Sequence, residues 1–304
     1  MSKMPIWLKL FIGNIGYSLF RLQLKIKGKK PSVVDEDGTV AFLLKNKCSV
    51  ARFGDGEFLW MLQKRQSGNF EKNSPELAKR LYEVLTIPKK DLIICIPNVF
   101  SGLRGLKKET RIYWEGFFIK NGNQVIKLLP EDKKYFDTQF TRPYMDYLIG
   151  NRNFKNKFRE IQKIWNNRNL LIVEGEQSRF GVNSDLISNA KSIKRILCPS
   201  KNAFEIYDKI LASVQKEAQK IDDVLILVSL GPTATVLAFD LCGEFQTIDI
   251  GHLDVEYNWF KMHASRKVAI PGKYVNELKN KKFISELSSD ELLEYKKQII
   301  SKID

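Results

Sequence analysis

Several features that mark common functional classes are missing from this sequence of 304 residues. It has only two histidines, His252 and His263, which excludes a metal site built from several histidines. Its four cysteines are far apart and none forms a CxxC pair, so we expect reduced thiols in a cytoplasmic protein. A G-x-G-x-x-G motif after a first strand is also absent, which disfavours a dinucleotide oxidoreductase.

Acidic residues are missing from the first 34 positions, where seven basic residues occur. Lys9 and Asn14 interrupt the apolar stretch there, which therefore falls short of the roughly 20 clean residues that a transmembrane helix needs. The stretch also lacks the small-residue cleavage site of a signal peptide. Trp, Phe and Leu flanked by Lys and Arg are typical of an interfacial helix on an anionic membrane leaflet. An ordinary helix packed on the domain or on a partner subunit explains the segment equally well.

The net charge of +15 favours anionic partners, which include phosphates, nucleic acid and anionic lipid. The basic residues are dispersed and no nucleic-acid-binding motif occurs, so a specific nucleic-acid binder is the weaker interpretation. Apolar content of 43% is ordinary for a globular chain of this length, which is long enough for a full core.

Short apolar runs alternate with helical patterns along the chain. The runs are continuous rather than alternating, as expected for strands buried on both faces of a parallel sheet. The predicted strands are 49–53, 91–97, 169–175, 193–199, 223–230 and 245–251, and the predicted helices are 75–85, 201–219, 233–242 and one that follows a capping box at 288–291. This alternation predicts an α/β fold with a Rossmann-like, doubly wound, mostly parallel sheet, in which ligands bind beyond the carboxyl ends of the strands.

Four polar motifs directly follow predicted strands. They are RFGDGEF (52–58), EGEQSRFGVNSD (174–185), SLGPTAT (229–235) and IGHLDVEY (250–257). The first and fourth each contain a D-x-E pair, Asp55/Glu57 and Asp254/Glu256, whose hard oxygen atoms suit Mg²⁺ or Mn²⁺ completed by water and substrate phosphates. A single D-x-E pair is more often a solvated turn, but two at strand ends of one sheet favour a site.

The remaining polar residues of these motifs have roles that complement a metal. Arg52 and Arg179 are candidate phosphate ligands, with a surface ion pair as the alternative. Gly231, Pro232 and Thr233 begin a helix whose free N–H groups form an anion site, although a tight strand–helix turn explains that stretch alone. The candidates for proton transfer or for binding sugar hydroxyls are Glu174, Glu176 and His252, for which turn capping and a structural histidine are the alternatives.

Together these features predict a metal-assisted site for a nucleotide diphosphate. A metal-dependent phosphohydrolase that uses the same carboxylates with water as acceptor is an alternative, and a basic nucleic-acid-binding protein is a weaker one.

Five stretches carry a family resemblance: the first motif, the second motif, CPSKNAFEIYD (198–208), SLGPTATVLAFDL (229–241) and the fourth motif extended to NWF. Together they resemble the GT-D-type glycosyltransferases, a bacterial family first catalogued as a domain of unknown function. The resemblance covers roughly 35–275 and leaves a basic apolar segment (1–34) and a helical tail (276–304) outside. It implies a Rossmann-like domain that transfers a sugar from a nucleotide-diphosphate donor, typically UDP-linked, with a D-x-E motif that binds Mn²⁺ or Mg²⁺. The implied acceptor is a hydroxyl of a surface glycan, a lipid-linked glycan or a glycoprotein.

Under this resemblance our working assignment places Asp254 and Glu256 on the metal, with Asp55 and Glu57 as the alternative pair. Asp55, Glu57, Glu174, Glu176 and His252 are then the catalytic candidates. The residues assigned to the donor are Arg52, Gly54, Asp55, Arg179, Asp185, Gly231, Pro232 and Thr233. The family pattern has Gly-Val-Gly-Asn-Asp-Leu where this chain has Gly-Val-Asn-Ser-Asp-Leu (181–186), so the turn before Asp185 is altered.

Overall fold

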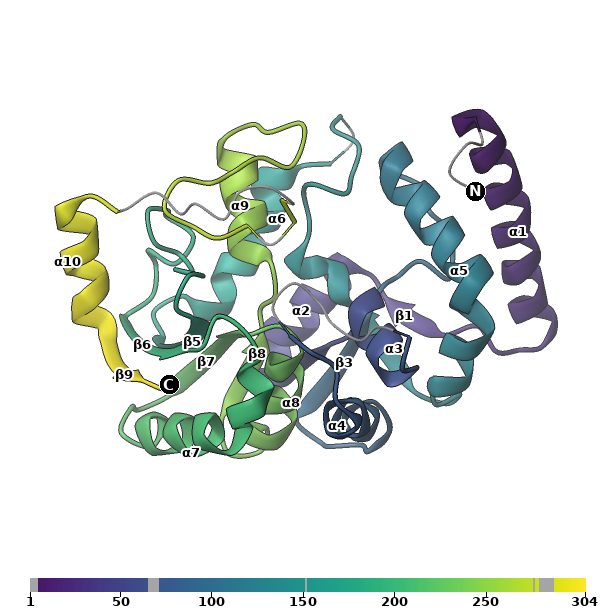
Figure 1. Cartoon of the computed structure of the whole chain (residues 1–304). Coiled ribbons are helices and arrows are strands. Elements are labelled where there is room, and N and C mark those ends of the chain that lie inside the picture. Colours follow the sequence, from purple (N-terminus) through teal and green to yellow (C-terminus); the bar gives the residue numbers. More distant parts are fainter. Residues whose placement is uncertain (1–4, 65–70, 151, 276, 279–286) are drawn as a thin grey trace.

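The computed structural model describes residues 5–64, 71–150, 152–275, 277–278 and 287–304. In this part of the chain, nine strands form one sheet in the order β1-β4-β3-β2-β8-β7-β5-β6-β9 (Figure 1). Every pairing between neighbouring strands is parallel. The predicted α/β fold with a mostly parallel, doubly wound sheet is therefore confirmed.

The elements have the following bounds. The strands are β1 (Ser32–Val34), β2 (Ser49–Arg52), β3 (Leu92–Ile96), β4 (Lys134–Asp137), β5 (Asn169–Gly175), β6 (Ser192–Cys198), β7 (Val224–Ser229), β8 (Gln246–Asp249) and β9 (Ile299–Lys302). The α-helices are α1 (Ile6–Ile26), α2 (Glu36–Asn46), α3 (Asp55–Met61), α4 (Pro75–Thr86), α5 (Lys108–Leu128), α6 (Phe154–Gln162), α7 (Tyr207–Ala218), α8 (Pro232–Leu241), α9 (Leu253–Lys261) and α10 (Ser289–Gln298). Three short 3₁₀ helices complete the set: η1 (Thr138–Thr141), η2 (Lys163–Trp165) and η3 (Ala203–Ile206).

Alternate residues of the central strands enter different parts of the core. Along β5, Leu171 and Val173 pack in a cluster with side chains of α7 and α8, whereas Leu170 and Ile172 belong to a larger cluster that contains Trp165. All four β5 side chains are fully buried. This burial on both faces explains the continuous apolar runs and why these strands were predictable.

The six predicted strands all occur, whereas β1, β4 and β9 were not predicted. β1 and β9 are short and partly exposed, and β4 has only Tyr135 and Phe136 between two charged residues, so none of the three gives a clear apolar run. The predicted helix 201–219 is divided into η3 and α7, because Asn202 has a left-handed backbone (φ 54°) and Ile206 leaves the helical region (φ −119°, ψ 32°). The predicted capping box is present at Ser288 and Glu291, but the chain after α10 joins the sheet as β9.

All four cysteines are free thiols, in agreement with the prediction. None of the helices in the described ranges is both long and apolar enough to cross a membrane.

Candidate active site

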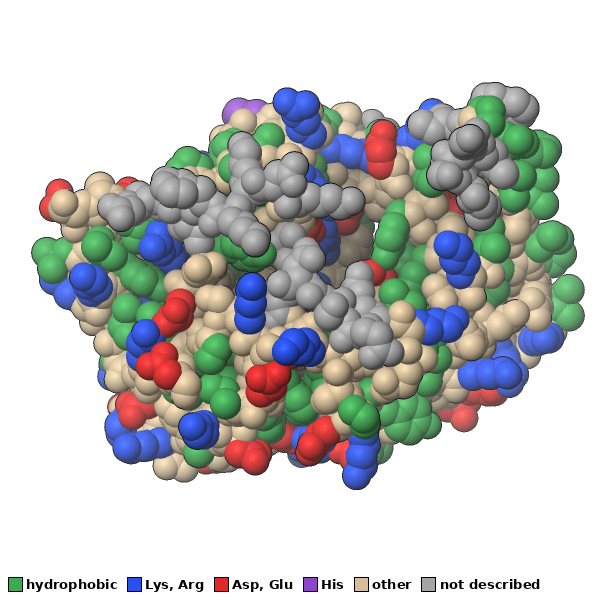
Figure 2. Space-filling model, viewed as in Figure 1, with side chains coloured by type: hydrophobic (Ala, Val, Ile, Leu, Met, Phe, Trp, Pro, Cys, Tyr) green, Lys and Arg blue, Asp and Glu red, His purple; other side chains and the backbone are tan. Residues whose placement is uncertain are grey.

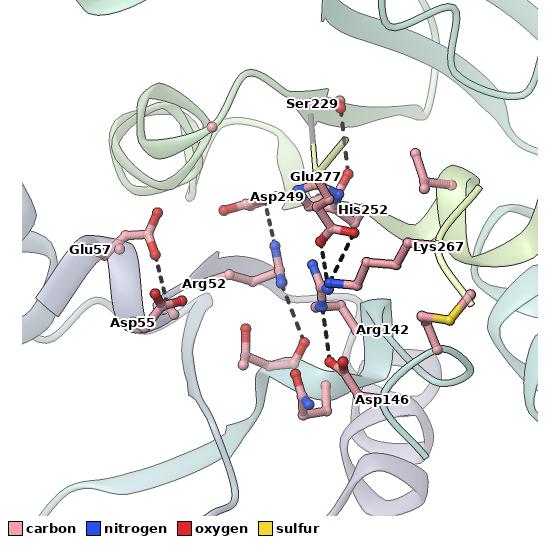
Figure 3. A pocket seen from close by; sticks show the side chains of 18 of the residues that line it. Arg52, Asp55, Glu57, Arg142, Asp146, Ser229, Asp249, His252, Lys267 and Glu277 are labelled. Atoms are coloured by element: carbon pink, nitrogen blue, oxygen red, sulfur yellow. Dashed lines mark hydrogen bonds and ion pairs between the residues drawn. The ribbon is translucent and has the colours of Figure 1, made fainter. Parts of the chain in front are cut away.

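A cavity of about 1000 Å³ lies at the carboxyl edge of the sheet. Figure 2 shows the surface hollowed in the middle of the view, and Figure 3 shows the lining side chains. The ends of β2, β8, β7 and β5 reach this cavity through Arg52, Asp249, Ser229 and Gly175. Because all strands run parallel, their carboxyl ends meet at one edge, which brings together residues from distant parts of the chain.

The first D-x-E pair lies on the wall of this cavity. β2 ends at Arg52, and α3 begins at Asp55 after Gly54 in an extended conformation. Glu57 folds back so that its Oε2 accepts the N–H of Gly54 at 2.7 Å, while the Tyr113 hydroxyl donates to Asp55. Burial raises the pKa of Glu57 to about 7, and the negative charges of Asp55 and Asp249 add to the effect. This corner therefore crowds carboxylates where an added cation is favourable.

Asp249 is a functional candidate that the sequence reasoning did not single out. It is 4% exposed at the end of β8 and pairs with Arg52, with 3.3 Å between Oδ1 and Nη1. It also accepts the Thr235 hydroxyl and the Gly251 N–H, each at 3.1 Å. Burial raises its pKa and the Arg52 charge opposes this rise. The signal in the sequence that could have identified Asp249 is a carboxylate between two isoleucines in the predicted strand 245–251.

Gly251 lets Arg52 reach Asp249. Its φ is +50°, and a Cβ placed there would lie 1.9 Å from Nη1 of Arg52. Any larger residue at this position would displace the guanidinium from its partner.

A second group of charges surrounds Arg142, which follows η1. Its guanidinium lies 2.7 Å from Glu277 and 3.4 Å from Asp146, and Lys267 approaches Glu277 at 3.3 Å (Figure 3). Burial alone would raise the pKa of Glu277, but the charges of Arg142 and Lys267 outweigh it and lower that pKa to about 2. His252, from the fourth motif, also lines the cavity, and burial and the Arg142 charge lower its pKa to about 4. Its imidazole is therefore neutral at pH 7.

The second D-x-E pair, at the start of α9, does not line the cavity. Asp254 is 4% exposed and pairs with the buried Lys273 at 2.6 Å. Glu256 is fully buried and its Oε2 accepts the N–H groups of Tyr144 at 3.0 Å and Met145 at 2.7 Å. Apart from Arg142 of the cavity lining, which lies 4.0 Å from Glu256 Oε1, the contacts of both carboxylates lie within the protein core. The geometry therefore gives no support to our working assignment of the metal to this pair. The alternative pair, Asp55 and Glu57, is the one that faces the cavity.

The charged residues of the second motif also lie outside the cavity lining. Glu174 is fully buried in an ion pair with Arg195 (2.6 Å) and accepts the N–H of Phe180 at 2.6 Å. Glu176 pairs at 2.8 Å with Lys302, the last residue of β9. These contacts connect β5 to β6 and to the C-terminal strand, and they do not point to a catalytic role.

Arg179 and Asp185, which we had assigned to the donor, are likewise directed elsewhere. Arg179 donates to the carbonyl of Gly272 at 2.8 Å. Asp185 is exposed and accepts the Tyr257 hydroxyl at 2.8 Å, with Lys261 at 3.2 Å. Both residues lie outside the cavity lining, which the chain leaves after Ser178.

The third motif contributes mainly through its backbone. Gly231 lines the cavity with φ +56° and ψ −139°, and α8 begins at Pro232. Pro232 and Thr233 are buried, and the Thr233 hydroxyl donates to Glu71 at 3.3 Å. Of the three residues expected to bind the anion, only Gly231 faces the cavity.

The described residues contain no cluster of three or more His, Cys, Asp or Glu side chains close enough to hold a metal ion by themselves. Mg²⁺ and Mn²⁺ are commonly held by one or two carboxylates together with substrate phosphates and water, so a closed protein cage is not required. Asp55, Glu57 and Asp249 are hard oxygen donors of the kind that suit such an ion.

Comparison with known proteins identifies the family. The family model described as "Glycosyltransferase GT-D fold" matches residues 50–278. The chain belongs to the GT-D glycosyltransferase family. The match includes the first D-x-E pair, Asp249, Arg142 and Glu277, and therefore the whole charged part of the cavity described above. The family resemblance seen in the sequence is confirmed.

Two curated relatives carry glycosyltransferase names. This GT-D chain is 37% identical over 248 residues to "Probable glycosyl transferase Gly" of Streptococcus gordonii, a match over 81% of the chain and 35% of that protein. It is 34% identical over 269 residues to "Glycosyltransferase GlyD" of Streptococcus pneumoniae, over 88% of the chain and 32% of that protein. The chain thus spans about a third of the length of these relatives.

Solved structures of similar domains are matched over their full length. One, described as a domain of unknown function 1792 with a distinct glycosyltransferase fold, has a TM-score of 0.85 and 36% identity, with 95% of this GT-D chain covered. A second, described as a new glycosyltransferase from Streptococcus sanguinis, has a TM-score of 0.83 and 34% identity over 90% of this chain. Both are covered completely by the match.

Proposed function

We propose that this GT-D chain transfers a sugar from a UDP-linked donor to a hydroxyl of an acceptor in a reaction that needs Mn²⁺ or Mg²⁺. The observation that carries the proposal is the cavity at the carboxyl edge of the sheet. There Asp55, Glu57 and Asp249 lie near basic side chains and near Gly231, at the start of α8. Family membership supports glycosyl transfer as the reaction class, and the donor and the metal are inferred from the chemistry of the lining.

Asp55 and Glu57 are the residues that would hold the cation, together with the phosphates of the donor. Burial and neighbouring negative charge already oppose ionisation of Glu57, so a cation at this corner would stabilise the carboxylates. When bound, a divalent ion would neutralise the charge that develops on the departing diphosphate. Arg52 is held by Asp249 and by the Thr138 carbonyl, which orients its guanidinium at the floor of the cavity.

The diphosphate also needs cationic protein groups, and the lining supplies them. Arg142 lies among Asp146, Glu277 and Lys267, and ion pairs of this kind fix the direction of each side chain. The basic residues that line the cavity are Arg52, Lys107, Arg142, Arg266 and Lys267. The lining also contains seven acidic side chains, so the positive charge that an anionic donor needs would come from these basic groups together with a bound cation.

The acceptor side of the reaction needs a hydroxyl group brought close to the donor sugar. His252 is uncharged at pH 7, so it can accept a hydrogen bond from that hydroxyl without adding charge to the site. Tyr113, Trp114 and Tyr274 in the lining offer apolar faces on which a sugar ring or a nucleobase can pack. We expect the acceptor to be a surface glycan, a lipid-linked glycan or a glycoprotein.

A thermal-shift panel of nucleotide sugars, with and without Mn²⁺, tests the donor. We expect a UDP-sugar to raise the melting temperature only when Mn²⁺ is present, because binding to the folded state adds to its stability. Transfer to a sugar acceptor should stop in EDTA and return with Mn²⁺. Full transfer in EDTA would exclude the metal role, and release of free sugar at a rate that acceptors do not change would identify a hydrolase instead.

A further inference from the structure

Helix α1 (Ile6–Ile26) has one face buried against α5. Phe20 stacks on Phe118 with ring centroids 5.2 Å apart, and Tyr17 and Leu24 are also buried. Gly122 of α5 makes this close approach possible, since a Cβ there would lie 2.7 Å from the Phe20 ring. The helix is therefore firmly packed on the domain through this face.

The opposite face of α1 is apolar and exposed. Its large hydrophobic side chains have exposed fractions from 40% to 76%: Phe11, Ile12, Ile15, Leu19, Leu22 and Ile26. At about 100° per residue, these six positions fall within an arc of roughly 100° on the helix. In Figure 2 hydrophobic side chains gather along the right edge of the molecule, where Figure 1 places α1. Single exposed hydrophobic residues are ordinary, but a continuous stripe of six marks an interaction surface.

The charges next to the stripe indicate what it binds. No acidic residue occurs before Asp35 in the sequence, and Lys25, Lys27 and Lys30 are exposed at the end of α1 and just beyond it. In a twofold pair the same patch meets itself, and α1 carries no acidic residue that could partner these lysines. An apolar stripe beside clustered lysines complements an anionic lipid surface, in which the stripe enters the acyl boundary and the lysines contact headgroups.

We propose that the exposed face of α1 docks this GT-D domain on an anionic membrane surface. Cosedimentation of the chain 1–304 with vesicles tests this directly, using phosphatidylglycerol-containing vesicles beside pure phosphatidylcholine. We expect binding to the anionic vesicles that weakens as salt rises, and at least tenfold weaker partitioning to the neutral ones.

Variants separate the two parts of the surface. Leu22→Glu should lower partitioning more than about tenfold because it places a charge in the apolar stripe. The matched control is Leu148→Glu, at a leucine that is 55% exposed where Leu22 is 53%, and it should bind like the wild type. Lys27→Gln should lower partitioning about fivefold.

Three results would overturn the proposal: no binding to anionic vesicles, equal loss in Leu22→Glu and Leu148→Glu, or a wild-type dimer in light scattering that Leu22→Glu converts to monomer. The last result would assign the stripe to self-association. Because Leu22 is exposed, circular dichroism of the variant should match the wild type, which separates a loss of docking from a loss of folding.

Discussion

The two D-x-E pairs of this chain have the same spacing and the same local setting, yet the fold uses them differently. Each pair lies in the first turn of a helix that follows a parallel strand. Asp55 and Glu57 line the cavity, whereas Asp254 and Glu256 point into the core. Asp254 pairs with Lys273 and accepts from the Gly181 N–H and from Asn258, and Glu256 accepts two backbone N–H groups, so three of the four oxygen atoms have hydrogen-bond partners.

This difference shows that a short acidic motif has a function only through the groups around it. Carboxylates that already have buried partners stabilise the fold and have little capacity left for a ligand. Glu57 at the cavity wall, whose pKa is raised to about 7 by burial and by the charges of Asp55 and Asp249, remains available for a cation. Four experiments test this contrast.

The largest effect is expected at Asp254. Asp254→Asn leaves Lys273 buried without its counter-charge, and breaking such a pair costs about 3–5 kcal/mol of unfolding free energy. Urea denaturation measures the loss, and titration of the folded variant should show unchanged Mn²⁺ affinity. The double variant Asp254→Asn/Lys273→Met is the control, because it removes both charges while the Asn oxygen can still accept the Gly181 N–H, so most of the stability should return. A stable Asp254→Asn protein with weakened Mn²⁺ binding would reverse the roles of the two pairs.

Asp55→Asn should act in the opposite way. We expect kcat for sugar transfer to fall about 10²–10³-fold, the range seen when one electrostatic contact to a transition state is removed. The unfolding free energy should change by less than about 1 kcal/mol, because Asp55 is only partly buried. Glu176→Gln, also at a strand end but outside the cavity, is the matched control and should retain transfer. Equal kcat values in the two variants would remove Asp55 from the site.

The Arg142 cluster predicts a pH dependence of stability. The pKa of Glu277 is about 2 in the fold against an ordinary value of 4.5, so its ionised form stabilises the folded state. This contribution is complete above pH 4.5 and is lost as the pH falls towards 2. Glu277→Gln should therefore cost on the order of 2–3 kcal/mol at pH 7, and the difference from the wild type should shrink as the pH falls from 4.5 towards 2.

Denaturation at pH 7, 4 and 3 measures this change. Glu160→Gln serves as the control, because the Lys163–Glu160 pair is exposed and should contribute less than about 0.5 kcal/mol at any of these values. A difference between Glu277→Gln and the wild type that stays constant with pH would show that the carboxylate charge is not what stabilises this cluster.

The smallest effect is expected at Asp185. Its contacts with Tyr257 and Lys261 are on the surface, so Asp185→Asn should change stability by less than about 1 kcal/mol. The KM for the donor should be unchanged, because the side chain lies outside the cavity. A tenfold rise in that KM would return Asp185 to the donor site.

Much of the fold could be predicted because its central strands are buried on both faces. Continuous apolar runs such as the one in β7 have no other simple explanation, and the parallel sheet then predicts that ligands bind at the carboxyl edge. The edge strands β1 and β9 could not be predicted, since they are short and their burial is incomplete. Their place in the sheet depends on partners that are distant in the sequence.

The sequence alone determined that acidic and basic residues follow buried strands, and its motifs were specific enough to indicate the family. Tertiary structure decided which of those residues face the cavity. Asp55 and Asp254 have the same kind of local sequence, but Asp254 is enclosed by Lys273, Asn258 and the Gly181 N–H, whereas Asp55 lines the cavity. Arg142 and Glu277 are 135 residues apart in the chain and meet only in the fold. Local sequence limits the directions in which a side chain can point. Burial and charged groups from distant segments then determine what that side chain is able to bind.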